Sequence, residues 1–195
     1  MAELLKAPEL MSKAKKELNQ VIGKGNQVKE SDITQLPYLQ AIVKETLRLH
    51  PALPLVPRQS ESDVEVFGYT IPKASQVLVN VWAIGRDPTI WGNNPSEFLP
   101  ERFLDSNIDV RARNFEFIPF GGGRRICPGL PMAMRMLHLM LGSLILSFDW
   151  KLEDGVSPES MISVDDQFGL SLQMAQPLRA IPIMCWNVAL ESRCL

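Results

Sequence analysis

The sequence predicts a mainly α-helical chain with small β-sheets. Three stretches, at about 8–22, 38–50 and 128–148, carry apolar residues at helical spacing. Short alternating runs and a total of 15 prolines favour short strands and irregular loops in the remainder of the chain. With 195 residues, of which 46% are hydrophobic and 22% charged, the chain belongs to the ordinary globular class and is long enough for one domain.

The helices have recognisable ends. Pro8 suits the first turn of a helix, and Gly23 follows the last residue of that helical pattern. The second helix is predicted from about Tyr38 to His50, where Pro51 closes it. We expect the apolar stretch Met136–Phe148 in the third helix to be buried core, because it is too short to span a bilayer.

Short strands and loops fill the rest of the sequence. Residues 64–71 alternate and predict a hairpin that turns at Gly68, and residues 76–82 predict another strand. Residues 85–119 are rich in Pro, Asn, Asp and Arg without periodicity, and irregular segments of this length are usually functional or wrapped on another element. Residues 149–195 predict short strands and turns.

Charge and cysteine content exclude several functional classes. The net charge of -2 lacks the basic excess typical of proteins that bind nucleic acid. Cys127, Cys185 and Cys194 form no CxxC pair, which argues against a disulfide framework or a zinc site and favours a reducing compartment. No basic-then-apolar segment opens the chain, so we expect neither a signal peptide nor a membrane anchor in it.

One cysteine stands at the start of the third predicted helix. In the run FGGGRRICPG, residues 120–129, Cys127 precedes a helix N-terminus, whose free N–H groups and partial positive charge stabilise a thiolate. Arg124 and Arg125 add positive charge, and the glycines leave room for a large flat group. An anionic cysteine below a flat cavity is what a thiolate-ligated haem requires.

Other interpretations stay open on the residues alone. Glycines and arginines before a helix also suit a phosphate, although the lysine and hydroxyl of a P-loop are missing. A lone cysteine at a helix start is commonly a small buried hydrophobe. His50 and His138 have no partner at ligand spacing, so we assign neither to a metal. We expect four methionines of the last helix to fill the core: Met132, Met134, Met136 and Met140.

The cysteine run fits the pattern FxxGxRxCxG and resembles the haem-binding loop of the cytochrome P-450 superfamily. The matching positions are Phe120, Gly123, Arg125, Cys127 and Gly129. Two further segments resemble the same superfamily in the same order, since residues 45–48 (ETLR) match its ExxR helix and residues 100–103 match its PERF segment. The sequences of residues 44–51 and 167–170 are similar to those of plant microsomal members that hydroxylate geraniol and related terpenoids.

Three of these matched residues suit a structural network. Glu45 and Arg48 lie one helical turn apart and can pair. Arg102 arrives from the irregular segment, which would let one carboxylate bind two guanidinium groups in forked geometry and lock the loop onto the helix.

The resemblance implies a haem b cofactor whose iron takes Cys127 as its axial thiolate. Arg125 and Arg58 would each neutralise a propionate, Phe120 would pack beside the thiolate, and Gly123 would let the loop approach the porphyrin. The alternative for Arg58 is a solvated loop arginine.

The resemblance also implies two segments that touch substrate, 53–56 and 168–172, both apolar enough for a hydrocarbon skeleton. The alternative is plain core. The residues expected to touch substrate are Leu53, Leu55, Val56, Phe168 and Leu170.

The implied activity is that of a monooxygenase that inserts one oxygen atom of O2 into a small apolar, terpenoid substrate. Electrons would come from NADPH through a flavoprotein reductase. The full-length family lies at the endoplasmic reticulum membrane on its cytosolic face, whereas this chain, without an anchor, would be cytosolic.

The chain departs from the family pattern in its extent. Family members are more than twice as long, and the distal helix with its acidic residue and threonine lies outside this sequence, so no catalytic residue is assigned. We expect residues 1–183 to be the C-terminal part of one cytochrome P-450 domain, followed by a non-family tail at 184–195. Two alternatives remain: a truncated, non-catalytic remnant that binds haem or a partner, and a helical module without a cofactor.

Overall fold

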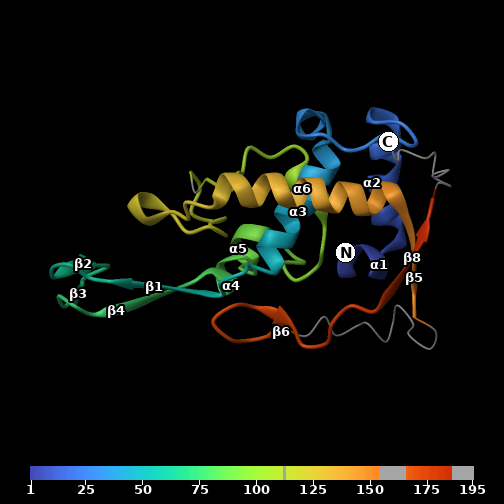
Figure 1. Cartoon of the computed structure of the whole chain (residues 1–195). Helices are drawn as coiled ribbons and strands as arrows, with labels where there is room; N and C mark the ends of the chain where they lie inside the picture. Colours follow the sequence, from blue (N-terminus) through green and yellow to red (C-terminus); the bar gives the residue numbers. More distant parts are fainter. Residues whose placement is uncertain (112, 154–165, 186–195) are drawn as a thin grey trace, which may run out of the picture.

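The computed structural model describes residues 1–111, 113–153 and 166–185. Its helices gather in one body, and two-stranded sheets extend from that body (Figure 1). The predicted class, mainly α with small β-sheets, is confirmed.

Helices α2 and α3 follow the predicted boundaries closely, whereas α1 was not predicted. Helix α1 (Ala2–Lys6) is followed by α2 (Pro8–Val21), which has proline in its first turn as expected. A short 3-10 helix, η1 (Glu30–Gln35), connects α2 to α3 (Pro37–Leu49). Thus the second predicted helix begins and ends one residue earlier than its pattern indicates.

Helix α3 lies at the centre of the packing. Its residues Leu39 and Ile42 belong to a core cluster that includes Leu4 of α1, Leu18 of α2 and Ile145 of α6. On the same helix, Ala41 belongs to a second cluster that joins the irregular segment to the start of α6. The other buried members of that second cluster are Trp91, Phe103, Val110, Phe117 and Leu130. One helix is therefore buried from several sides, which explains its predominantly apolar sequence.

The first sheets form an extended ribbon beside the helices (Figure 1). Strand β1 (Leu55–Gln59) pairs antiparallel with β4 (Gln76–Asn80), and β2 (Val64–Val66) pairs with β3 (Tyr69–Ile71) around Gly68. The hairpin is confirmed. No strand was predicted at β1, because Pro57 interrupts its alternation. The strand predicted at 76–82 ends at Asn80, whose side chain accepts a hydrogen bond from the N–H of Ala83 and caps α4 (Val81–Ile84).

The irregular segment wraps against α3. It contains only α5 (Pro88–Trp91) and η2 (Pro100–Phe103) as short helical turns in its described residues. Its aromatic rings pack together, with centroids 5.7 Å apart for Trp91 and Phe103 and 5.2 Å apart for Phe103 and Phe117. The segment is therefore irregular in backbone but fixed by a core of its own.

Helix α6 (Leu130–Ser147) is only partly buried, which corrects the expectation of a buried core helix. Three of its methionines are exposed, with fractions of 71% for Met132, 44% for Met136 and 57% for Met140, so they do not fill the core. Met134 alone of the four packs against the second cluster. The helix contacts α2, α3 and η1 through one stripe, and the period of 3.6 residues turns the remaining apolar positions outward.

Helix α6 is also longer than the apolar stretch in the sequence indicates. Among the described residues it is the one helix that by length and composition could cross a membrane, with 18 residues and a mean hydropathy of 1.4. The apolar core helices of soluble proteins meet the same measure. Its packing on three other elements accounts for part of this apolar character.

Two further sheets follow α6. Strand β5 (Phe148–Leu152) pairs with β8 (Ala180–Met184), and β6 (Asp166–Gln167) pairs with β7 (Gln173–Met174). Of the predicted tail at 184–195, residue 184 ends β8, whereas residues 186–195 lie outside the described residues. The domain boundary at 183 stays a prediction.

Candidate haem-thiolate site

A tight loop precedes α6 and presents the cysteine. The short 3-10 helix η3 (Gly123–Arg125) lies within it, and Gly121 and Gly123 have φ angles of 72° and 66°, which only glycine adopts without strain. The Cys127 N–H donates a hydrogen bond to the Phe120 carbonyl oxygen at 3.0 Å and closes the loop. These contacts explain why the motif needs glycines at its turns.

Cys127 lies at the N-terminal end of α6 with its thiol open. Its carbonyl oxygen accepts a hydrogen bond from the N–H of Leu130, the first residue of the helix. The side chain is exposed, which contradicts the alternative of a small buried hydrophobe. A Cβ added at Gly129 would lie 3.7 Å from the Cys127 sulfur, so the sulfur lies beside the Gly129 backbone.

Arg58 reaches this loop from strand β1. A Cβ added at Gly121 would lie 3.2 Å from the Arg58 Nη2 atom, so the guanidinium group lies close to the loop backbone. Arg58, Arg124 and Arg125 line one open groove of about 1050 Å³. Three guanidinium groups on one groove favour a ligand with carboxylates, because each can bind a carboxylate through two N–H groups.

The residues present fit a thiolate-bound haem. An exposed thiol, a groove lined by arginines and open space above Gly123, where an added Cβ meets no atom within 4 Å, are the features that this cofactor needs. Phe120 is half-buried against the second core cluster. In the described part of the chain no three His, Cys, Asp or Glu side chains gather in an arrangement that could hold a metal ion.

Glu45 and Arg48 of α3 form a fully buried ion pair. Arg48 Nε donates to Glu45 Oε2 at 2.6 Å and Arg48 Nη2 to Glu45 Oε1 at 2.7 Å, with both side chains 0% exposed. Arg48 also donates to the carbonyl oxygens of Gly85, Pro95 and Glu97, at 2.5, 2.6 and 3.0 Å. One guanidinium group thus fastens three points of the irregular segment to α3.

Arg102 joins this network less directly than predicted. Its Nε lies 3.6 Å from Glu45 Oε1, within range of an ion pair but too far for a hydrogen bond. Glu45 Oε1 instead accepts the N–H of Leu99 at 2.8 Å, and Arg102 donates to the carbonyl oxygens of Trp91 and Asn94. Glu45 therefore pairs with two guanidinium groups as expected, but Arg48 alone binds it in forked geometry, and Arg102 stays at ion-pair distance beside the Leu99 N–H.

The two segments expected to touch substrate lie side by side. The Leu172 N–H donates to the Ala52 carbonyl oxygen at 3.0 Å, and this bond joins the β6–β7 turn to the chain before β1. The exposed fractions of the predicted apolar contacts are 41% for Leu53, 45% for Leu55, 61% for Phe168 and 91% for Leu170, with Val56 half-buried. Their exposure contradicts the alternative that these segments are plain core.

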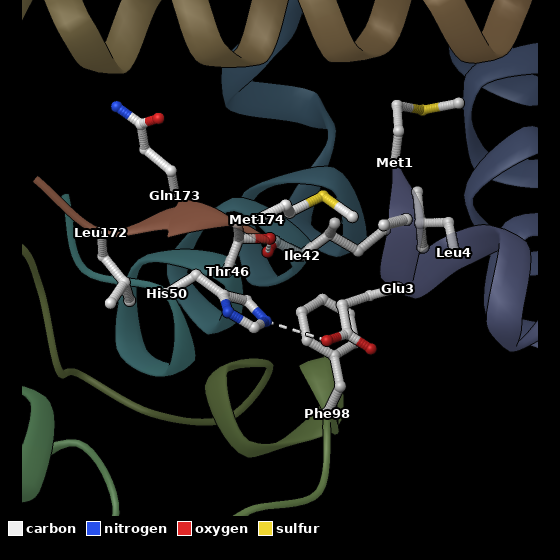
Figure 2. Close-up of a pocket in the computed structure, with 11 residues that line it drawn as sticks. Met1, Glu3, Leu4, Ile42, Thr46, His50, Phe98, Leu172, Gln173 and Met174 are labelled. Atoms are coloured by element: carbon white, nitrogen blue, oxygen red, sulfur yellow. Dashed lines mark hydrogen bonds and ion pairs between the residues drawn. The ribbon is translucent and has the colours of Figure 1, made fainter. Parts of the chain in front are cut away.

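A separate small cavity lies between α1, α3 and β7 (Figure 2). It measures about 200 Å³, and His50 Nε2 lies 2.8 Å from Glu3 Oε1 at its edge. Burial opposes ionisation of Glu3, but the hydrogen bond and charge of His50, with the charge of Lys6, outweigh it and lower the pKa of Glu3. His50 is thus paired with a carboxylate, whereas His138 is buried, with a ring nitrogen 2.5 Å from the Met134 carbonyl oxygen, and burial lowers the pKa of His138.

Sequence reasoning missed Gly85 and Trp82. A Cβ at Gly85 would come far inside contact distance of the Arg48 carbonyl oxygen, so only glycine fits there. Trp82 contacts Phe168, with ring centroids 5.9 Å apart. Neither contact had a local signal, because each joins segments that lie far apart in the sequence.

Comparisons with known proteins agree with this geometry. Residues 1–176 match the sequence profile of the family described as Cytochrome P450. The chain is 59% identical over 182 residues to a geraniol 8-hydroxylase from Swertia mussotii, and 58% identical over 184 residues to a geranylhydroquinone 3''-hydroxylase from Arnebia euchroma. These alignments cover 93% and 94% of this chain but 36% and 37% of the relatives, so the chain spans little more than a third of their length.

A solved structure supports the fold as well. A zebra fish cytochrome P450 solved with abiraterone superimposes with a TM-score of 0.82 at 32% sequence identity, over 94% of this chain and 41% of that one. The family profile covers most of the chain, including the cysteine loop, the ion-pair network and the segments around them. The chain therefore belongs to the cytochrome P450 family, whose members are haem-thiolate monooxygenases.

Proposed function

We propose that Cys127 is the axial thiolate of a haem b and that Arg125 and Arg58 pair with its propionates. The observation that carries this proposal is the exposed thiol at the start of α6, two residues after an arginine that shares a groove with Arg58. The bound haem would supply the activation of O2 and the transfer of one oxygen atom.

The other residues of this site would position rather than react. Glu45 and Arg48 fasten the irregular segment to α3, and that segment leads directly into the cysteine loop. Phe120 anchors the loop through its packing and its carbonyl oxygen. We assign this network the role of holding the Cys127 thiol at a fixed distance from the arginine-lined groove. A large cofactor that is bound through both needs such a fixed geometry.

We infer a small apolar, terpenoid substrate. Leu53, Leu55, Phe168 and Leu170 offer an exposed apolar surface on two adjoining segments, which suits a hydrocarbon skeleton. Relatives of the chain are named for hydroxylation of geraniol and of geranylhydroquinone. Electrons would come from NADPH through a flavoprotein reductase, and the proposed location of the whole protein is the cytosolic face of the endoplasmic reticulum membrane.

A haem titration of the purified chain tests the ligand. The reduced carbon monoxide complex of the parent should give the Soret band of a thiolate ligand, and Cys127→Ser should lose that band. Cys185→Ser is the matched control, because Cys185 is half-buried at the end of β8 and should leave the band unchanged. A thiolate band that survives in Cys127→Ser would contradict the assignment.

Turnover separates the enzyme from the non-catalytic alternative. The haem-loaded chain is incubated with geraniol, NADPH and a flavoprotein reductase, and hydroxylated product is measured. Product would support the monooxygenase activity in this polypeptide. A thiolate band without product would favour a haem-binding role that depends on further protein for its chemistry.

A further inference from the structure

Three segments that are distant in sequence meet beside the predicted substrate surface. The chain before β1 accepts two backbone hydrogen bonds, from the Leu172 N–H to the Ala52 carbonyl oxygen at 3.0 Å and from the Trp82 N–H to the Pro54 carbonyl oxygen at 3.2 Å. It therefore holds the β6–β7 turn on one side and the first turn of α4 on the other. These hydrogen bonds fix the main chains of the three segments relative to one another. The side chains then determine the shape of the predicted substrate surface.

The Trp82 side chain joins α4 to the β6–β7 turn. Its ring lies 5.9 Å from the Phe168 ring at an interplanar angle of 65°, in an edge-to-face arrangement. The Arg86 guanidinium carbon lies 4.1 Å from the centroid of the Trp82 ring. A cation over the ring limits its rotation and adds a favourable charge–quadrupole contact, so Trp82 is a rigid support for Phe168.

The β6–β7 hairpin depends on such a support. Its ladder has only two residue pairs, Asp166 with Met174 and Gln167 with Gln173, and a two-stranded hairpin of this size is marginal without packing. Phe168 is 61% exposed, so burial alone does not fix its ring. The contact with Trp82 and the bond from Leu172 to Ala52 both join this turn to segments that are distant in the sequence.

We propose that Trp82 is a positioning residue for substrate binding, which sets the separation between the Phe168 turn and the segment at 53–56. This inference rests on the proposed function, because it assigns both segments to the substrate surface. Trp82 acts through Phe168. Loss of its ring should let the turn move away from Ala52 and weaken the affinity for a small terpenol. The cysteine loop should remain unchanged.

Hydrogen exchange and ligand binding together test this role. In the haem-loaded chain, Trp82→Leu should speed amide exchange in residues 166–174 by roughly 2- to 12-fold, the range that an aromatic pair supports. The dissociation constant for geraniol, measured from the Soret shift, should rise by a similar factor. Trp82→Phe keeps an aromatic ring and should restore both values in large part.

Two further variants distinguish loss of the Trp82–Phe168 contact from general misfolding. Phe168→Leu removes the same contact from its exposed side and should reproduce the effect, and the double variant with Trp82→Leu should be no worse than either single one. Tyr69→Leu, an aromatic residue of β3 that is 78% exposed, is the control and should change neither reading. The thiolate band should stay the same in all of these variants.

The outcomes separate this inference from the proposed function. Unchanged exchange at 166–174 in Trp82→Leu would overturn the inference even if geraniol binds the parent. Faster exchange with unchanged geraniol affinity would refute the effect on substrate binding. If geraniol gives no shift in the parent, the proposed substrate class and the role in substrate binding both fail, whereas the exchange result still decides whether Trp82 holds the turn.

Discussion

At the scale of single residues, Glu45 and Arg48 form a fully buried ion pair that fastens the irregular segment to α3. Both side chains are fully buried, so each charge needs the other and the surrounding carbonyl oxygens. An exposed pair in the same chain, Arg135 with Glu30, has a similar distance of 2.8 Å but side chains that are 62% and 57% exposed. Two ion pairs of similar length should therefore contribute very differently to the free energy of unfolding.

Glu45→Gln should destabilise the chain by about 3–5 kcal/mol, because it leaves the Arg48 charge buried without its counter-ion. Chemical denaturation measures this loss as a change in the free energy of unfolding. Arg135→Gln is the matched control and should have little effect, because solvent screens its exposed pair. Equal losses in the two variants would show that burial does not govern the pair.

Gly85 is the second residue-scale determinant, and Gly85→Ala should destabilise the chain by about 1–3 kcal/mol. The new methyl group would overlap the Arg48 carbonyl oxygen, which α3 holds in place. Gly169→Ala is a suitable comparison, because an added Cβ there lies 3.5 Å from the nearest backbone oxygen, an ordinary contact. Thermal unfolding of the two variants provides the measurement, and a tolerant Gly85 would mean that α3 can shift.

At the scale of elements, α6 shows why an apolar pattern does not define burial. Ile145 is fully buried against α2 and α3, whereas Met132 on the same helix is 71% exposed. The sequence offers nearly all-round apolar character, so the helix period alone does not select the packed face. The neighbours α2, α3 and η1 select it.

Substitutions on the two faces of α6 should differ sharply. Ile145→Ala should cost about 2–5 kcal/mol through lost packing and a residual cavity, whereas Met132→Gln should change stability by less than about 0.5 kcal/mol. Both values follow from denaturation of the purified chain. A large loss in Met132→Gln would mean that a further contact covers this face in solution.

At the scale of the whole molecule, the pair of Glu3 and His50 ties the N-terminal helix to the end of α3 (Figure 2). The pKa of Glu3 lies below its ordinary value of 4.5 in the folded chain. A carboxyl group with a lowered folded pKa stabilises the fold above its unfolded pKa and loses that contribution as the pH falls through the folded value. The pair therefore adds to global stability at neutral pH.

Thermal unfolding as a function of pH should reveal this contribution. The parent should be more stable than Glu3→Gln at pH 6, and the difference should shrink as the pH falls below about 4.5, where Glu3 takes up a proton. Glu9→Gln on α2 is the control, and its difference from the parent should not follow this pH window. A constant difference between parent and Glu3→Gln across the range would contradict the assigned pKa shift.

Much of the fold followed from local patterns. Pro8, Pro37 and the glycines after α2 define helix ends through backbone geometry that does not depend on the rest of the chain. The hairpin at Gly68 and the cysteine at the start of α6 are likewise local features. Strand β1 was missed because Pro57 interrupts its alternation, and its pairing with β4, which lies 17 or more residues away, makes it a strand.

By itself, the sequence determined the class of fold, the haem-loop motif and the partners Glu45 and Arg48, because each depends on residues within one turn or one loop. Only the tertiary structure decided that Arg102 lies at ion-pair distance from Glu45 while the Leu99 N–H donates to that carboxylate, and that Arg58 lies against the cysteine loop. It also decided that Trp82 supports Phe168. These contacts join segments far apart in the chain, and their geometry is set by how α3, α6 and the sheets pack, which no local pattern encodes.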